Sequence, residues 1–91
     1  MSKVCLHYFI SGRTQGVWFR KFVKEKAVSL KLSGWVKNSS DGRVEVYACG
    51  DKAQLEMLEQ WLWKGPLLAK VTQVTQESAQ WIEFPDFSIA F

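Results

Sequence analysis

The spacing of apolar residues along the chain changes repeatedly between two periods, and the order of these changes restricts the fold more than any other feature. Strands are predicted where apolar and β-branched residues alternate or run together, at residues 4–11, 35–37, 44–49 and 71–75, with a short fifth at 87–91. Helices are predicted where apolar residues recur at intervals of three and four, at residues 19–33 and 52–64. The order βαββαβ is that of the ferredoxin-like arrangement, an α+β fold with a mostly antiparallel sheet and two helices packed on one face.

Residues that favour turns and helix ends separate these segments. Gly34 is predicted to be the C-cap of the first helix, and Asp41–Gly42 marks a hairpin turn. Asp51 is expected to cap the second helix, with Gln54 three residues later as a partial capping box. Gly65–Pro66 then ends that helix.

Length and composition fit a single domain over residues 1–91. The chain has 91 residues, of which 47% are hydrophobic and 23% charged, which is enough for one core and too little for two. It contains no apolar run long enough to cross a membrane, so we expect no membrane partner. The first seven residues become polar too soon for a secretory signal, and we therefore expect a cytoplasmic protein.

Positive charge is concentrated in the first half of the chain. Residues 1–43 contain nine Lys or Arg and two acidic residues, whereas residues 44–91 contain three and seven. This asymmetry favours an anionic partner, large or small. Simple solvation of the first helix by its lysines would explain part of the excess.

The predicted topology brings two distant segments to one edge of the sheet. Strands 1 and 2 should run parallel, with strand 3 antiparallel between them. Because parallel strands have their carboxyl ends at the same edge, residues 12–20 and the neighbourhood of Asn38 are expected to meet there. Two strand spacings, roughly 10 Å, separate their backbones, which leaves room for a small ligand.

The same pairing should bring the two cysteines together. Cys5 begins strand 1 and Cys49 ends strand 3, so we expect them to oppose one another on the solvent side of the sheet. Two cysteines are too few for a disulfide framework, and these two lie too far apart in sequence for a CxxC site. Oxidation depends on the compartment, and in a reducing cytosol the thiol form is expected.

The loop between the first strand and the first helix has the composition of a phosphate cradle. Glycines at Gly12 and Gly16 let the backbone curl around an anion, and N–H groups near a helix start are unpaired and carry the positive end of the helix dipole. Arg20 can add a bidentate clamp. The loop is neither the nucleotide P-loop, which requires GxxxxGK[ST], nor the dinucleotide GxGxxG fingerprint.

Asn38 follows the second strand and has two possible roles. Asparagine is common in turns, and a purely structural role would be sufficient to explain it. Its carboxamide can also orient a water molecule, since the oxygen accepts one hydrogen bond while the NH₂ group donates another. It cannot act as a strong base.

Together the two segments resemble the paired signatures of the acylphosphatase family. The first signature, Gly-x-Val-Gln-Gly-Val-x-Phe-Arg, is matched at Gly12, Gln15, Gly16, Val17, Phe19 and Arg20. The second, Gly-aromatic-Val-Lys-Asn-x-x-x-Gly-x-Val with a later glycine, is matched over residues 34–44 and at Gly50. Gly65–Pro66 and residues 69–71 extend the resemblance. Thr14 departs from the family, which usually has valine there, and Trp18 falls at a variable position.

The resemblance implies a small stand-alone enzyme that hydrolyses the carboxyl–phosphate bond of acyl phosphates. Arg20 and the backbone N–H groups of Gln15, Gly16, Val17, Trp18 and Phe19 would hold the phosphate, and Asn38 would position the attacking water. No metal and no cofactor are implied. The partners would be the acyl phosphate and inorganic phosphate, as product or inhibitor, with no nucleic acid, and the enzyme would be a monomer.

The sparse site suits this reaction. A carboxylate is a weak base that leaves without protonation, so no general acid is required. Positioning and charge stabilisation can supply most of the remaining rate enhancement. A phosphomonoester, whose alkoxide leaving group needs help, would not suit such a site.

Two non-catalytic modules share the predicted element order. An RNA-recognition domain displays aromatic residues on its central strands, but here strand 3 offers only Tyr47 beside Glu45 on its outer face. A small-anion-binding or regulatory domain would normally belong to a longer chain. His7, without a second histidine or an acidic neighbour in sequence, is expected to be a surface strand residue.

Overall fold

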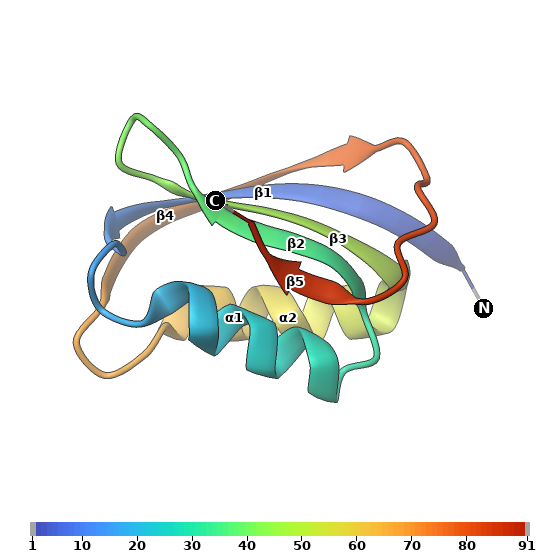
Figure 1. Ribbon diagram of the computed structural model, residues 1–91, viewed down its shortest axis with the longest axis horizontal. Coiled ribbons are helices and arrows are strands. Elements are labelled where there is room, and N and C mark those ends of the chain that lie inside the picture. Colours follow the sequence, from blue (N-terminus) through green and yellow to red (C-terminus); the bar gives the residue numbers. More distant parts are fainter. Residues whose placement is uncertain (1, 91) are drawn as a thin grey trace.

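The computed structural model describes residues 2–90 as a five-stranded sheet with two helices on one of its faces (Figure 1). The elements are β1 (Lys3–Arg13), α1 (Phe19–Ser29), β2 (Ser33–Asn38), β3 (Val44–Asp51), α2 (Lys52–Lys64), β4 (Lys70–Ala79) and β5 (Phe87–Ile89). The predicted α+β, ferredoxin-like order is therefore confirmed. Phe91, at the end of the predicted fifth strand, lies outside the described residues.

The strand order is β4-β1-β3-β2-β5, with β3 between β1 and β2 as predicted. β3 pairs antiparallel with β1, from Lys3 opposite Asp51 to Ile10 opposite Val44. It also pairs antiparallel with β2, so β1 and β2 run in the same direction. β4 pairs antiparallel with β1 and extends further than predicted, whereas β5 pairs parallel with β2.

Alternate residues of the strands face the helices and form the core. The fully buried strand residues on this face include Tyr8, Ile10, Val36, Val44, Val46 and Ala48. The helices contribute Phe19, Val23 and Ala27 from α1 and Leu55, Leu58 and Leu62 from α2. This match between the period of two in the strands and the period of 3.6 in the helices stabilises the two-layer arrangement.

The end of α1 differs from the prediction. The helix ends at Ser29, with Leu30 as its C-cap and Lys31 in the left-handed conformation at φ 60°. Gly34, predicted as the C-cap, instead lies inside β2 with φ 135°. A Cβ atom there would lie 1.8 Å from the carbonyl oxygen of Tyr47 on β3. Glycine is required because the two strand backbones approach closely, not because the helix ends.

The predicted ends of α2 are partly confirmed. Asp51 is the N-cap residue in an extended conformation, but its side chain makes no capping hydrogen bond, so the predicted capping box does not form. Instead, the N–H group of Lys52 donates to the carbonyl oxygen of Ser2. At the other end Gly65, with φ 66°, is the C-cap, as predicted.

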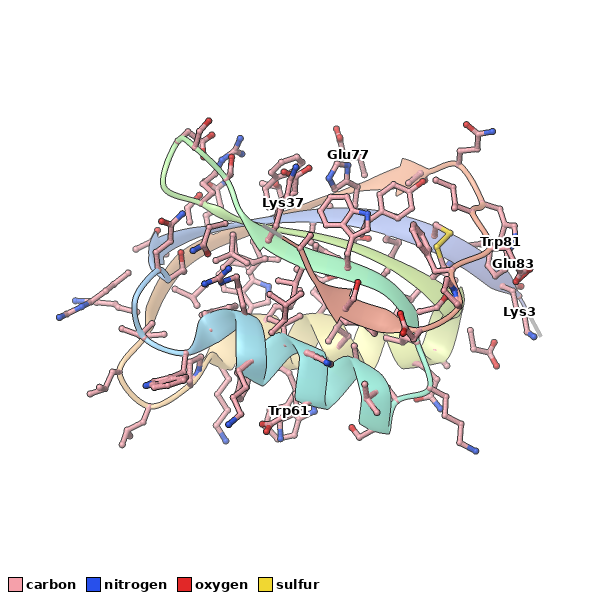
Figure 2. The ribbon with its side chains drawn as sticks, viewed as in Figure 1. Lys3, Lys37, Trp61, Glu77, Trp81 and Glu83 are labelled. Carbon is pink, nitrogen blue, oxygen red and sulfur yellow. A yellow bond between two sulfur atoms is a disulfide. The ribbon has the colours of Figure 1, made fainter. Side chains whose placement is uncertain are left out.

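The outer face of the sheet carries more aromatic side chains than the sequence suggested. The rings of Trp35 and Tyr47 stack at 5.8 Å, and that of His7 lies within 6 Å of both and of Phe9. The Nε2 atom of His7 also lies 2.6 Å from a carboxylate oxygen of Glu45. The expectation that no acidic partner lies near His7 is therefore wrong. In Figure 2, Lys37 and Glu77 project from this face, and Trp61 lies on the opposite side, below the helices.

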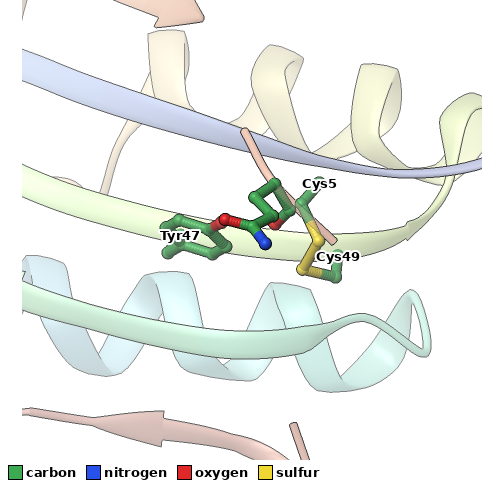
Figure 3. Close-up of a disulfide and its surroundings, with 4 residues drawn as sticks. Cys5, Tyr47 and Cys49 are labelled. Atoms are coloured by element: carbon green, nitrogen blue, oxygen red, sulfur yellow. A yellow bond between two sulfur atoms is a disulfide. The ribbon is translucent and has the colours of Figure 1, made fainter. Parts of the chain in front are cut away.

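Cys5 and Cys49 oppose one another, as predicted, and form a disulfide (Figure 3). The expected thiol form is therefore not what the structure contains. Both residues lie on the outer side of the sheet but are buried, at 2% and 1% exposure. The segment 80–86 lies over this end of the sheet, where the Tyr47 hydroxyl donates to the carbonyl oxygen of Gln80. The cysteines lie on the predicted face of the sheet, but the prediction that they are exposed to solvent was wrong.

Within residues 2–90, no helix is long and apolar enough to span a membrane.

Removing the disulfide is expected to lower the free energy of unfolding by roughly 2–4 kcal/mol, because the bond closes a long loop in the unfolded chain. The two cysteines are separated by 44 positions. The measurement is urea unfolding of the protein with and without dithiothreitol. The double variant Cys5→Ser/Cys49→Ser is the control and should not respond to dithiothreitol. An unchanged midpoint in wild-type protein whose mass shows full reduction would contradict the expectation.

Candidate functional site

The loop between β1 and α1 and the end of β2 meet at one end of the molecule, at the left in Figure 1. They enclose a cavity of about 470 Å³. Its lining residues are Thr14, Gly16, Trp18, Phe19, Arg20, Lys21, Asn38 and Ile89. The predicted meeting of residues 12–20 with Asn38 is therefore confirmed.

A change of strand register directs the loop away from the sheet. The pairing of β1 with β4 shifts between Ser11 and Gly12. Gly12 has φ 120°, and a Cβ atom there would lie 2.1 Å from the carbonyl oxygen of Lys70. Only glycine permits this close approach of the two backbones. The chain then turns to the start of α1 through Trp18, a non-glycine residue with φ 65°.

The N-terminus of α1 lies at the cavity, since Trp18, Phe19 and Arg20 all line it. The first backbone hydrogen bond at this end joins the N–H group of Phe22 to the carbonyl oxygen of Trp18. The N–H group of Phe19 precedes it and so has no acceptor inside the helix. The first turn contains no acidic residue. This end of the helix therefore provides donors and a positive dipole end for an anion.

Arg20 and Asn38 reach the cavity from two different elements. Arg20 lies in the first turn of α1 and is half-buried. Asn38 is the last residue of β2, and its Oδ1 atom is buried without a hydrogen-bond partner among the described residues. A buried carbonyl oxygen without a partner costs free energy. A water molecule or ligand in the cavity would remove that cost.

The side chain of Gln15 connects the loop to the hairpin between β2 and β3. Its Nε2 atom donates to the carbonyl oxygens of Ser39, at 3.1 Å, and Arg43, at 3.0 Å. The sequence predicted a role only for its backbone. The side chain holds together the two segments that carry Arg20 and Asn38.

The hairpin itself contains a local ion pair. The guanidinium of Arg43 lies 2.8 Å from the carboxylate of Asp41, and the Arg43 N–H group donates to the same carboxylate. These hydrogen bonds lower the pKa of Asp41 to about 2. The pair is exposed and therefore contributes little to stability, but it lies in the same hairpin as the carbonyl oxygens that Gln15 contacts.

The predicted site residues do not all line the cavity. Gly16, Trp18, Phe19, Arg20 and Asn38 do. Gln15 is exposed and binds the hairpin, and Val17 is buried in the core cluster at 7% exposure.

Three lining residues, Thr14, Lys21 and Ile89, were not predicted. Lys21 could have been proposed as the basic neighbour of Arg20. Ile89 could not, because its position depends on the parallel pairing of β5 with β2.

No metal site is evident in the part of the chain that the structure describes: no three His, Cys, Asp or Glu side chains gather there.

Comparisons with known proteins agree on one family. The profile of the Acylphosphatase family matches residues 6–89. An acylphosphatase of Legionella pneumophila (strain Corby) is 47% identical over 96% of both chains. The solved structure of an acylphosphatase from Coxiella burnetii has a TM-score of 0.93 and 43% identity, covering 97% of this chain and 93% of that one. The crystal structure of acylphosphatase from Bacillus subtilis has a TM-score of 0.93 and 37% identity over 97% and 99%.

Thr14→Val is expected to stabilise the protein by about 1 kcal/mol, because a buried hydroxyl without a partner is replaced by an apolar group of the same shape. Thr14 is 1% exposed, and its Oγ1 atom has no hydrogen-bond partner among the described residues. Urea unfolding of wild type and variant provides the measurement.

The control for this substitution is Thr72→Val, at an exposed position of β4. It should change the free energy of unfolding by less than about 0.5 kcal/mol. A Thr14→Val protein that is less stable than wild type would show that the hydroxyl makes a favourable interaction.

Proposed function

The chain belongs to the acylphosphatase family and hydrolyses acyl phosphates, and we propose that Arg20 and Asn38 carry out this reaction together with the backbone at the start of α1. Arg20 and the N–H groups of residues 15–20 bind the phosphoryl oxygens. Asn38 holds a water molecule in line with the bond to the acyl oxygen. Water attacks phosphorus, and the products are inorganic phosphate and a carboxylate.

One observation supports this assignment above all: Arg20 and Asn38 line the same cavity at the N-terminus of a helix. The phosphoryl group and the attacking water must be neighbours, which requires the groups proposed to bind them to line one cavity.

The cavity provides positive charge from several sources. An arginine can bind two phosphoryl oxygens in a bidentate manner, and the helix start adds aligned N–H dipoles. Lys21 lines the same cavity and increases the positive potential. Charge on the equatorial oxygens in the transition state is therefore stabilised by groups that are already in place, which is the main requirement of phosphoryl transfer.

Asn38 is suited to orienting water and not to deprotonating it. A carboxamide oxygen accepts a hydrogen bond from water but does not take the proton. A loose, metaphosphate-like transition state needs little help from a base, because the bond to the nucleophile is hardly formed. The unpartnered Oδ1 atom of Asn38 is the acceptor that such a water would use.

The leaving group explains why so few groups suffice. A carboxylate departs without a proton, so no general acid is needed. The reaction that we propose requires no metal, and inorganic phosphate competes with the substrate for the site at Arg20. One chain provides all the proposed groups, so the monomer is sufficient.

The test is hydrolysis of benzoyl phosphate in EDTA by wild type, Arg20→Ala and Asn38→Ala. Wild type should be active in EDTA. Arg20→Ala should lower kcat/KM at least 100-fold, by analogy with the loss of one transition-state donor, roughly 10²–10³. It should also abolish competitive inhibition by inorganic phosphate. Asn38→Ala should lower kcat by roughly 100-fold and leave that inhibition in place.

The matched control is Arg13→Ala, which removes an exposed arginine at the end of β1 that does not line the cavity. Its kinetics should equal those of wild type. Full activity of folded Arg20→Ala, or complete loss of wild-type activity in EDTA, would refute the mechanism.

A further inference from the structure

Trp18 combines two features that do not favour the folded state. Its backbone is in the left-handed region, at φ 65° and ψ 23°, which bulky side chains rarely adopt. Its side chain is 75% exposed, so the indole gains little from burial. Strained residues of this kind cluster at ligand sites, where the surroundings hold them in place. Packing and helix capping therefore do not account for a tryptophan at this position.

The indole of Trp18 lies at the proposed reaction site. Trp18 lines the cavity that contains Arg20 and Asn38. It also lines a second hollow of about 330 Å³ with Lys21, Phe22, Glu25 and Pro66. Trp18 and Lys21 thus lie on the boundary between the two hollows. A molecule that extends out of the first cavity in this direction must pass over the indole.

Most of the lining that remains after the phosphate groups are assigned is apolar. Arg20, Asn38 and the helix N–H groups are assigned to the phosphoryl group and the water. Trp18, Phe19 and Ile89 are the large apolar side chains of the same lining. Phe19 is almost fully buried, so Trp18 provides the most accessible ring. The ammonium of Lys21 lies 5.8 Å from the ring centre, within the range of a cation–π contact that restrains the indole.

We propose that Trp18, with Ile89, forms an acyl-binding subsite that selects acyl phosphates with an aromatic or extended apolar acyl group. This inference depends on the proposed function, since the phosphate must lie at Arg20. The acyl group then leaves the cradle along the indole, where an aromatic group can stack and an alkyl chain can be buried. A short acyl group, such as acetyl, has too little surface to use the subsite.

The test compares benzoyl phosphate with acetyl phosphate in wild type, Trp18→Gly and Trp18→Phe. Glycine removes the ring and accepts the left-handed backbone. Trp18→Gly should lower kcat/KM for benzoyl phosphate about tenfold more than for acetyl phosphate, which corresponds to about 1.4 kcal/mol. Trp18→Phe should keep the ratio of the two substrates within about threefold of wild type, because an aromatic face remains. Any loss of phosphate binding in these variants, whose cradle includes the Trp18 N–H group, affects both substrates alike and cancels in their ratio, so the ratio isolates the role of the ring.

Two further variants control for misfolding and for the loss of a tryptophan elsewhere on the surface. Trp18→Asn also lacks the ring, and asparagine tolerates the left-handed region, so it serves if Trp18→Gly folds poorly. Trp63→Ala removes another exposed tryptophan, which is 47% exposed on α2 and does not line the cavity. Trp63→Ala should leave the substrate ratio unchanged.

Failure of this inference differs from failure of the proposed function. If the ring has no role in acyl selection, both substrates lose activity equally in Trp18→Gly or neither loses any, while Arg20→Ala still abolishes phosphate inhibition. Either result overturns the subsite. If the proposed function is wrong, Arg20→Ala retains phosphate inhibition. The subsite is then also overturned, because it requires phosphate at Arg20.

Discussion

Strand β3 pairs with β1 on one side and with β2 on the other, and the functional end of the molecule depends on this double pairing. It makes β1 and β2 parallel and two strand spacings apart, so the loop after β1 and the last residue of β2 share one edge. The close approach of β2 to β3 requires Gly34, because any Cβ atom there would collide with the carbonyl oxygen of Tyr47. Moving either strand would separate Arg20 from Asn38.

The proposed catalytic groups are held in position because they lie at the ends of a helix and a strand. Hydrogen bonds between the connecting segments restrain them further. Arg20 belongs to a helix and Asn38 to a strand, so both backbones are restrained by regular hydrogen bonds. Gln15 then ties the loop to the hairpin that follows Asn38. Such preorganisation matters because the proposed reaction forms no covalent intermediate with the enzyme and depends on position and charge. The Thr14 hydroxyl, which has no partner among the described residues, and the left-handed backbone of Trp18 lie in this same loop, and each costs free energy.

The sequence predicted the element order, the position of strand 3 between strands 1 and 2, and the meeting of Arg20 with Asn38, since these follow from apolar periodicity and the topology that goes with it. The sequence-based predictions were wrong where the role or burial of a residue depends on contacts with residues that are distant in sequence. Gly34 looked like a helix C-cap but is needed for strand approach, and the cysteines are covered by a segment more than thirty residues away in sequence. The side-chain bonds of Gln15 and the position of Ile89 at the cavity also depend on tertiary contacts that no local pattern encodes.

The most direct test of the central claim is a titration of ¹⁵N-labelled protein with inorganic phosphate, followed by the backbone amide signals. The claim predicts that the amides of residues 15–20 and the Asn38 side chain shift together with one dissociation constant, and that Arg20→Ala removes these shifts. Shifts confined to the outer face of the sheet, around His7 and Tyr47, would contradict it. So would shifts at residues 15–20 that persist in Arg20→Ala.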